Sequence, residues 1–274
     1  MIRRNEIIQW GVDHPWQNEN QVEQDLLLSR AMIEIANDGL LGQELVLRGG
    51  TAFHKLFLPE PYRYSEDLDF VRTTTGGIGG VMKGLTALGG ELGFDVRTKM
   101  GKFPKVYWRF TFEDGKPGKI KIEINTFERS PMLPLARVSH SVSSPFYTGQ
   151  AAILTFQAEE LVATKLRALY QRKKGRDLYD LWLALTILEL DPSKILEAFP
   201  AYRPEGLSGE QIIDNLRIKL QDKEFCSDVN AMIKASAPEY DPQIAGELVI
   251  EELLLPLCDN ADVNVNPKSR PASR

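Results

Sequence analysis

The fold is decided by the stretch Arg48-Gly49-Gly50-Thr51 and by the stretch Ser65-Glu66-Asp67-Leu68-Asp69 that follows it. The apolar run before Arg48 predicts a short strand, the two glycines predict a turn, and residues 52–57 predict a helix. Residues 67–71 alternate polar and apolar side chains, which is typical of a strand with one buried face. A strand, a glycine turn, a helix and a second strand together indicate a mixed α/β unit.

The N-terminal part of the chain continues this mixed pattern on both sides of the two stretches. Apolar side chains recur at helical spacing over residues 18–36, and a second helix is expected near residues 81–92. Residues 106–112 and 120–125 alternate as the two strands of a β-ribbon, with Asp114-Gly115 beginning the turn between them.

The C-terminal part changes to a helical pattern after about residue 153. Helices are expected over residues 158–171, 177–190, a short stretch after 193, 208–220 and 245–257. We therefore expect an α/β (α+β) fold in which a mixed sheet flanked by helices occupies residues 1–150. An all-helical portion over residues 151–258 and a disordered polar tail over residues 259–274 should follow.

Composition excludes several classes of protein. The chain has 274 residues and a formal charge of −5, which argues against a uniformly basic nucleic-acid wrapper. Cys226 and Cys258 are far apart and lack the spacing of a zinc site, so a reducing compartment is the simpler interpretation. No apolar run approaches the ~20 residues of a membrane span, and the polar N-terminus does not resemble a signal peptide. We expect a cytoplasmic protein without membrane contact.

The modest total charge hides an uneven distribution. Between Arg97 and Arg137 there are ten basic and four acidic residues. The aromatic residues Tyr107, Trp108, Phe110 and Phe112 lie among the basic ones. A basic ribbon that carries aromatic side chains could bind RNA backbone and unstacked bases. Alternatively, the alternate aromatic residues form the buried face of an amphipathic hairpin.

The two deciding stretches also carry the chemistry. Glycines at a strand-to-helix turn let the backbone approach a phosphate, and the start of the following helix favours its negative charge. On a strand, Asp67 and Asp69 project from one face, and paired carboxylates suit magnesium together with substrate phosphates. Glu123 holds a polar position on a neighbouring predicted strand and is the candidate third carboxylate, for a two-metal site or as a proton acceptor. Each feature alone is more often an ordinary turn or a solvated strand face, so the inference depends on their conjunction.

These residues resemble a known family. Residues 48–52 and 63–70 look like the signature of DNA polymerase β-type nucleotidyltransferases, specifically the AbiEii/MenA-like toxins of abortive-infection (phage defence) systems. Residues 160–169, Arg172 and residues 176–181 resemble the helical motif of the same family. The similarity extends over roughly residues 15–190. It implies a nucleotidyltransferase core followed by a helical portion.

The resemblance also implies roles for individual residues. Gly49, Gly50, Thr51 and Ser65 would bind the triphosphate, and Asp67 and Asp69 would hold the metal ions. Lys165 would neutralise phosphate or developing charge. Arg176, Asp177 and Asp180 would lie close to the nucleotide. Family members are the toxin halves of toxin–antitoxin pairs, and relatives transfer nucleotides from an NTP, for example to the 3′ end of tRNA.

The helical motif has a second interpretation that needs no family. Arg167, Arg172, Lys173, Lys174 and Arg176 form a basic run, and such a run is usually a solvated face. Asp177 is placed to favour a helix N-terminus, and Asp180 lies on the same helical face as an ordinary structural partner. Lys165, at the start of the run, is the better functional candidate.

The sequence therefore favours a magnesium-dependent nucleotidyltransferase toxin with NTP as substrate, RNA and in particular tRNA as acceptor, and an antitoxin encoded by a neighbouring gene as partner. Two alternatives stay open. One is a nucleotidyltransferase that modifies a small-molecule or protein hydroxyl. The other is a nucleotide-binding module without catalysis.

Overall fold

The computed structural model describes residues 2–259, and within them the chain forms a seven-stranded mixed sheet with the strand order β3-β4-β5-β2-β1-β7-β6. The strands are β1 Leu45–Arg48, β2 Asp67–Arg72, β3 Asp95–Lys99, β4 Lys105–Thr111, β5 Pro117–Asn125, β6 Ala136–Ser143 and β7 Thr148–Thr155. Strand β2 lies between β1, with which it is antiparallel, and β5, with which it is parallel.

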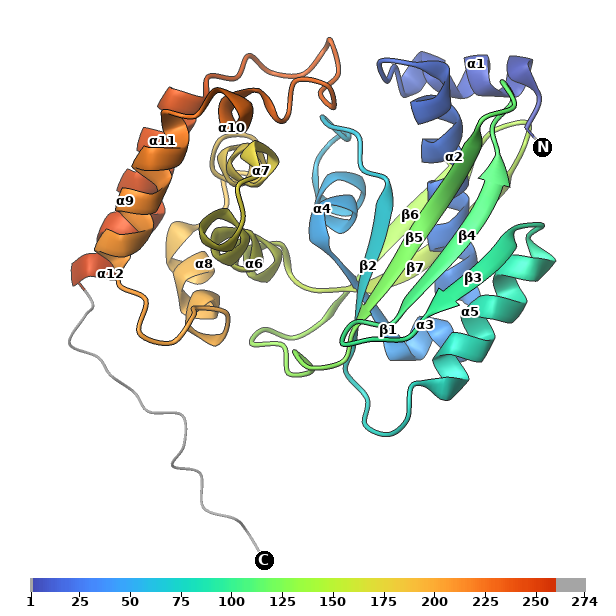
Figure 1. Cartoon of the computed structure of the whole chain (residues 1–274), viewed down its shortest axis with the longest axis horizontal. Coiled ribbons are helices and arrows are strands. Elements are labelled where there is room, and N and C mark those ends of the chain that lie inside the picture. Colours follow the sequence, from blue (N-terminus) through green and yellow to red (C-terminus); the bar gives the residue numbers. More distant parts are fainter. Residues whose placement is uncertain (1, 260–274) are drawn as a thin grey trace, which may run out of the picture.

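Helices cover one face of this sheet, and the C-terminal helices form a separate layer on the far side of α4 (Gly49–Ala52; Figure 1). Those of the N-terminal part are α1 Arg4–Asp13, α2 Glu19–Asn37, α3 Leu41–Glu44, α4 Gly49–Ala52, the π-helical η1 Phe53–Phe57 and α5 Gly79–Glu91. Those of the C-terminal part are α6 Ala158–Gln171, α7 Gly175–Thr186, α8 Pro192–Ala198, the 3₁₀ turn η2 Phe199–Ala201, α9 Gly209–Leu220, α10 Lys223–Ser227, α11 Pro242–Val249, η3 Ile250–Leu254 and α12 Leu255–Asp259. Across residues 2–259, no helix has the length and apolar character that crossing a bilayer requires.

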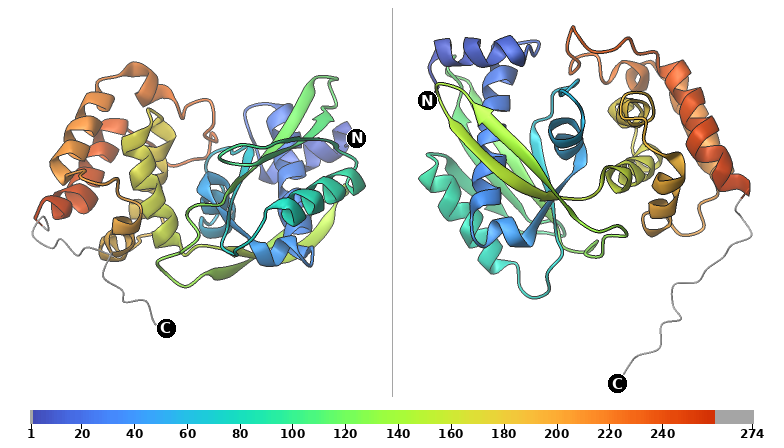
Figure 2. Two further views of the ribbon diagram at one scale, coloured as in Figure 1. Left: turned by 60° about the horizontal axis from the view of Figure 1, so that its bottom comes forward. Right: turned by 180° about the vertical axis from the view of Figure 1, so that it is seen from behind.

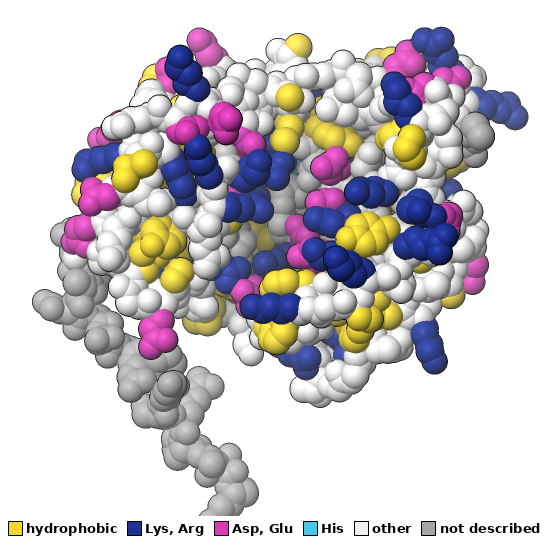
Figure 3. Space-filling view, in the orientation of Figure 1, with side chains coloured by type: hydrophobic (Ala, Val, Ile, Leu, Met, Phe, Trp, Pro, Cys, Tyr) yellow, Lys and Arg dark blue, Asp and Glu magenta, His cyan; other side chains and the backbone are white. Residues whose placement is uncertain are grey.

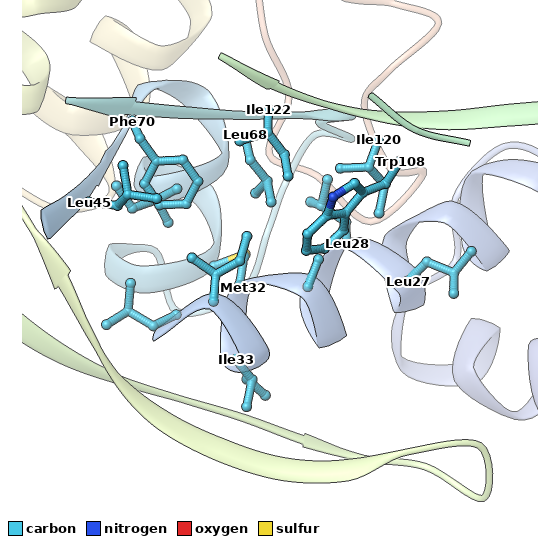
Figure 4. Close-up of a cluster of buried hydrophobic side chains, with 14 of the residues drawn as sticks. Leu27, Leu28, Met32, Ile33, Leu45, Leu68, Phe70, Trp108, Ile120 and Ile122 are labelled. Carbon is cyan, nitrogen blue, oxygen red and sulfur yellow. The ribbon is translucent and has the colours of Figure 1, made fainter. Parts of the chain in front are cut away.

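The main core lies between the sheet and helix α2. Asn18 caps α2 by accepting a hydrogen bond from the Gln21 backbone N–H, which fixes where the helix begins. Leu28 and Met32 of α2 face Leu68 of β2 and Ile122 of β5 (Figure 4). Because strand side chains alternate between faces, burying Leu68 and Ile122 in this core turns the polar residues beside them to the opposite face.

Side chains of β4 alternate between the two faces of the sheet, so the aromatic residues of the basic ribbon lie on different faces. Trp108 and Phe112 are buried, and Phe110 packs half-buried against the same core. The Trp108 indole N–H donates to the Leu85 carbonyl of α5 at 3.0 Å. The expectation of an aromatic RNA platform is therefore wrong for these three residues, which form the buried face of the hairpin. Tyr107 lies on the other face.

The helical part has its own apolar core, and both this core and a returning segment of chain contact the sheet part. Leu166 of α6 and Leu181 of α7 lie in this second core, which also takes in Phe53 of η1. A segment after α10 returns across the molecule and pairs with the loop before β2, where the Tyr64 N–H donates to the Met232 carbonyl at 2.8 Å. Figure 2 shows this return from two sides. Both cysteines are half-buried in the helical part.

Most expected elements are present, and the differences have physical causes. The long helix, the strands around the deciding stretches, the ribbon and the C-terminal helices all occur near their expected ranges. Strands β3, β6 and β7 were missed. Most side chains of β3 and β6 are exposed or half-buried and polar, so these strands lack apolar alternation, and β7 spans the expected boundary. The expected boundary after residue 150 falls inside β7, and we propose moving it to residues 156–157, where the chain leaves the sheet. The tail expected to be disordered lies outside the described residues, apart from Asp259, which ends α12.

Two adjacent glycines of α5 test the packing of the main core. A Cβ atom at Gly89 would lie 2.4 Å from the Trp108 Nε1, whereas a Cβ at Gly90 would meet nothing within 4 Å. We expect Gly89→Ala to lower the free energy of unfolding by about 1–3 kcal/mol, because the rigid indole cannot yield easily. Gly90→Ala, the matched control, should raise it by up to about 1 kcal/mol. Urea unfolding measures both, and equal effects of the two substitutions would contradict the packing described.

Candidate active site

Three carboxylates lie on the polar face of the sheet because of the register between β2 and β5. The parallel pairing places Asp69 beside Glu123 and Asp67 beside Lys121. On the other side of β2, Arg48 of β1 is the partner of Asp69. The expected neighbourhood of Glu123 and the aspartate pair is therefore present, on adjacent strands.

The three carboxylates differ in their partners. The Lys121 Nζ lies 2.7 Å from the Asp67 Oδ2, and the Lys105 Nζ lies 2.8 Å from the Glu123 Oε2. The Asp69 carboxylate, in contrast, makes no side-chain hydrogen bond or ion pair among the described residues, and only the backbone of Asp69 is paired, with β1 and β5. Burial raises the pKa of Asp69, and the nearby charges of Asp67 and Glu123 raise it further, against the effect of Lys121 and Arg48. An unpaired carboxylate beside two others is a favourable place for a cation.

The donor atoms therefore suit a divalent metal ion, but they are not yet gathered around one point. In residues 2–259, no group of three His, Cys, Asp or Glu side chains converges closely enough to hold an ion as the side chains stand. The ammonium groups of Lys105 and Lys121 occupy two of the carboxylates instead. Hard carboxylate oxygens on one rigid face remain the ligand type that magnesium prefers.

Both glycines of the first stretch are required by the side chains that pack against them. Gly49 has a φ of +80°, and a Cβ atom there would lie 2.9 Å from the Asp69 Oδ2. A Cβ atom on Gly50 would lie 2.3 Å from the Arg63 Nη2. The glycines begin helix α4 itself rather than a separate turn, and they allow its first backbone groups to approach Asp69 and Arg63.

The two hydroxyl residues of the stretches bind each other. The Thr51 hydroxyl donates to the Asp67 carbonyl at 2.6 Å and accepts from the Ser65 hydroxyl, 2.7 Å away. Thr51 is buried, whereas Ser65 lines the cleft. Thr51 thus fixes the start of β2 against α4, and only Ser65 of the pair is accessible to a ligand.

The wall that faces the carboxylates is organised by Asp180 of α7. The Arg63 guanidinium donates to both of its carboxylate oxygens at 2.7 Å, and the Lys165 Nζ lies 2.7 Å from the Oδ2. The His54 Nε2 donates to the Oδ1 at 2.9 Å. Burial opposes the charge of Asp180, but Arg63 and Lys165 hold its pKa well below the usual range. Burial and the charge of Arg63 lower the pKa of His54 to about 4, so this imidazole is neutral.

Asp177 anchors the next part of the same wall. Arg172 donates to both Asp177 oxygens at 2.6 and 2.7 Å, and the Lys165 Nζ lies 3.3 Å from the Oδ1. Asp177 and Asp180 are themselves fully buried. Their contact with the expected nucleotide site is therefore indirect, because they hold cations that line the cleft.

The basic run of the helical motif divides between the cleft and the outer surface. Arg167, Arg172 and Arg176 line the cleft, and the Arg176 guanidinium contacts the Met232 Sδ. Lys173 and Lys174 pair with Asp222 and Asp228 away from it. The interpretation as a solvated face is correct for the two lysines and wrong for Arg167 and Arg176, which are half-buried, whereas Arg172 is both exposed to solvent and part of the cleft wall.

A third cluster closes the other end of the cleft. Glu128 accepts from Arg48 at 2.6 Å and from Arg167 at 2.5 Å, which joins β1 to α6. Although burial opposes it, hydrogen bonds from Arg167 and Arg48 lower the pKa of Glu128 to about 2. The sequence did not single out Arg48, Arg63 or Glu128, because the partners in these ion pairs lie 39 to 117 residues apart in the chain.

These groups enclose a cleft of about 680 Å³ between the sheet and the helical part. Figure 3 shows the hollow, with basic side chains on both of its walls and acidic ones between them. Of the expected site residues, Gly50, Ser65, Asp67, Asp69, Glu123, Lys165 and Arg176 line it. Gly49, Thr51, Asp177 and Asp180 support these from behind. The volume lies within the usual range for a small-molecule site.

Comparison with known proteins identifies the class of enzyme. The model of the family of nucleotidyl transferase AbiEii toxins, of type IV toxin–antitoxin systems, matches residues 30–247. Since that range covers most of the chain, the protein belongs to this family and is a nucleotidyltransferase toxin. The resemblance noted from the two motif blocks is thereby confirmed.

One solved structure agrees with this assignment at the level of the fold. The chain is similar to MenT4, a nucleotidyltransferase toxin from Mycobacterium tuberculosis H37Rv, with a TM-score of 0.59 and 16% identity, covering 96% of this chain and 91% of that one. An antigenic nucleotidyltransferase-like protein from Paracoccidioides brasiliensis gives a TM-score of 0.39 and 16% identity, covering 76% and 94% of the two chains. No curated protein matches the chain by sequence. The likeness to MenT4 confirms the expected fold class.

The unpaired state of Asp69 predicts a conflict between stability and activity. Its pKa is higher in the folded chain than in the unfolded one, so its ionised form destabilises the fold at neutral pH. We expect Asp69→Asn to raise the melting temperature at pH 7 and to abolish nucleotidyl transfer. The gain should shrink as the pH falls through the raised pKa, because wild type then takes up the proton. Calorimetry over this range measures it, and a destabilised, active variant would contradict the description of the site.

Proposed function

We propose that this enzyme transfers a nucleotidyl group from an NTP to the 3′ end of RNA, with tRNA as the acceptor, and that it depends on magnesium. The observation that carries the proposal is the cleft itself, which sets Asp67, Asp69 and Glu123 opposite the cations that Asp177 and Asp180 hold. A metal–triphosphate complex carries both signs of charge and would satisfy both walls.

The triphosphate would lie along the wall nearest α4. The first backbone N–H groups of Gly49 and Gly50 have no partner within their own helix, and such groups bind phosphate well. Ser65 adds a hydroxyl, and Lys165, Arg172 and Arg176 add positive charge where negative charge grows on the leaving pyrophosphate. Arg63 would not bind the phosphates directly, since its guanidinium already donates hydrogen bonds to both oxygens of Asp180.

The carboxylates would hold the metal and accept the proton. Asp67 and Asp69 would bind two magnesium ions, with Glu123 as a third ligand or as the base; bound magnesium neutralises phosphate charge and polarises the reacting oxygens. The acceptor hydroxyl oxygen forms a bond to the α-phosphorus while the bond from that phosphorus to the bridging oxygen breaks. The hydroxyl proton passes to Glu123, and pyrophosphate leaves with the bonding electron pair.

The polar face of the sheet supports RNA as the acceptor. Beyond the carboxylates, β4 presents Lys105, Tyr107 and Arg109, and their register partners on β5 include Lys119 and Lys121. A positive surface that runs into the cleft suits the phosphate backbone of a nucleic acid better than a small acceptor. The choice of tRNA rests on the resemblance to AbiEii/MenA-like toxins, as does the expectation of an antitoxin from a neighbouring gene.

Label transfer tests this proposal directly. We expect the purified chain, with magnesium and a labelled NTP, to label the 3′ end of RNA in total tRNA. Asp67→Ala should reduce labelling to background. Asp95→Ala is the matched control, because Asp95 is an exposed carboxylate on β3 that pairs with Arg109, and it should label like wild type. Failure of wild type to label RNA would contradict the proposal, and rapid NTP turnover without RNA would favour a small acceptor.

A further inference from the structure

A pair of aromatic side chains lies at the mouth of the cleft and has no part in the chemistry described so far. Phe103 precedes β4 and lines the cleft, and Phe127 follows β5. Their ring centroids lie 5.9 Å apart at an interplanar angle of 82°. Phe127 is 63% exposed, whereas Trp108 and Phe110 of the ribbon pack in or against the core.

A lysine completes this cluster. The Lys102 Nζ lies 5.5 Å from the centre of the Phe103 ring and 5.8 Å from that of Phe127. Positive charge beside aromatic rings is the combination with which proteins bind the phosphates and bases of single-stranded nucleic acid. We call Lys102, Phe103 and Phe127 the aromatic clamp.

The backbone holds the aromatic clamp in place. The Asn125 Oδ1 accepts hydrogen bonds from the backbone N–H groups of Phe127 and Glu128. On the other side, the Ile124 N–H donates to the Pro104 carbonyl at 2.9 Å, next to Phe103. A large apolar ring that is exposed on a fixed loop offers a ready stacking surface, and stacking is how proteins bind unpaired bases.

The position of the clamp indicates which base it would bind. Across the sheet, Arg48, Asp69, Glu123 and Lys105 are register partners in that order, from β1 to β4. The groups proposed for the triphosphate lie at the β1 side of this row, around Gly50. The clamp lies at the β4–β5 side, beyond Glu123. In an in-line displacement the acceptor approaches opposite the leaving pyrophosphate, and hence from the side of the base Glu123.

We infer that the aromatic clamp stacks the unpaired base at the 3′ end of the acceptor RNA and thereby places its terminal hydroxyl beside Glu123. The identity of the acceptor rests on the function proposed above, whereas the stacking itself is a binding property that needs no reaction. The clamp thus selects RNA with a single-stranded 3′ tail over RNA with a blunt end.

Equilibrium binding without NTP tests this inference. Fluorescence anisotropy would compare the full chain bound to one RNA hairpin with a short unpaired 3′ tail and to the same hairpin with a blunt end. We expect the tail to tighten binding by about tenfold. Phe127→Ala should remove most of that advantage and leave binding of the blunt hairpin unchanged. Phe127→Tyr, which keeps an aromatic face, should preserve it.

Ile244→Ala is the control, because Ile244 is an equally exposed apolar residue on α11 of the helical part. The inference is overturned if wild type binds both hairpins alike, or if Phe127→Ala keeps the advantage of the tail. It is also overturned if Phe127→Ala raises the KM for NTP instead, because the clamp would then bind the incoming nucleotide. A tail preference that depends on Phe127, in a protein that labels no RNA, would contradict only the function proposed above.

Discussion

The structure depends on one buried carboxylate, that of Asp180. It accepts hydrogen bonds from Arg63 of the sheet part and lies 2.7 Å from Lys165 of the helical part, so a single group joins the two halves of the cleft. A buried charge is tolerated only when partners compensate it, and here three basic side chains surround it, one of them the neutral His54. The same contacts hold Lys165 in the cleft wall. Position 50 has no room for a side chain, because the Arg63 guanidinium packs directly on Gly50.

As a result, the two walls of the cleft present opposite charges to a ligand. The helical wall presents cations whose own carboxylates are buried behind them, while the sheet presents Asp69 without a partner among the described residues. Lys105 and Lys121 pair with the neighbouring carboxylates. A metal ion on the sheet side and a triphosphate on the helical side would satisfy both walls together, and the lysines would then be available to the acceptor.

The sequence predicts what depends on local spacing and misses what depends on long-range pairing. Asp67 and Asp69 could be placed on one strand face because alternation is local, and Glu123 because its own strand alternates. The register that sets Glu123 beside Asp69 joins segments about fifty residues apart, and no local pattern encodes it. Arg63 stands inside the deciding motif, yet its partner Asp180 lies 117 residues further along the chain. Likewise, the edge strands β3 and β6 could not be predicted, because their mostly polar side chains do not alternate between polar and apolar.

The most direct measurement is a crystal structure of the full chain with a non-hydrolysable NTP and manganese, whose anomalous signal locates the ions. We predict ions bound by Asp67 and Asp69, and phosphate oxygens within hydrogen-bonding distance of Lys165 and the Gly50 backbone N–H. Lys165 would keep its contact with Asp180. Phosphates bound away from Gly50 and Lys165, or ions that leave Asp69 without a ligand, would contradict this prediction.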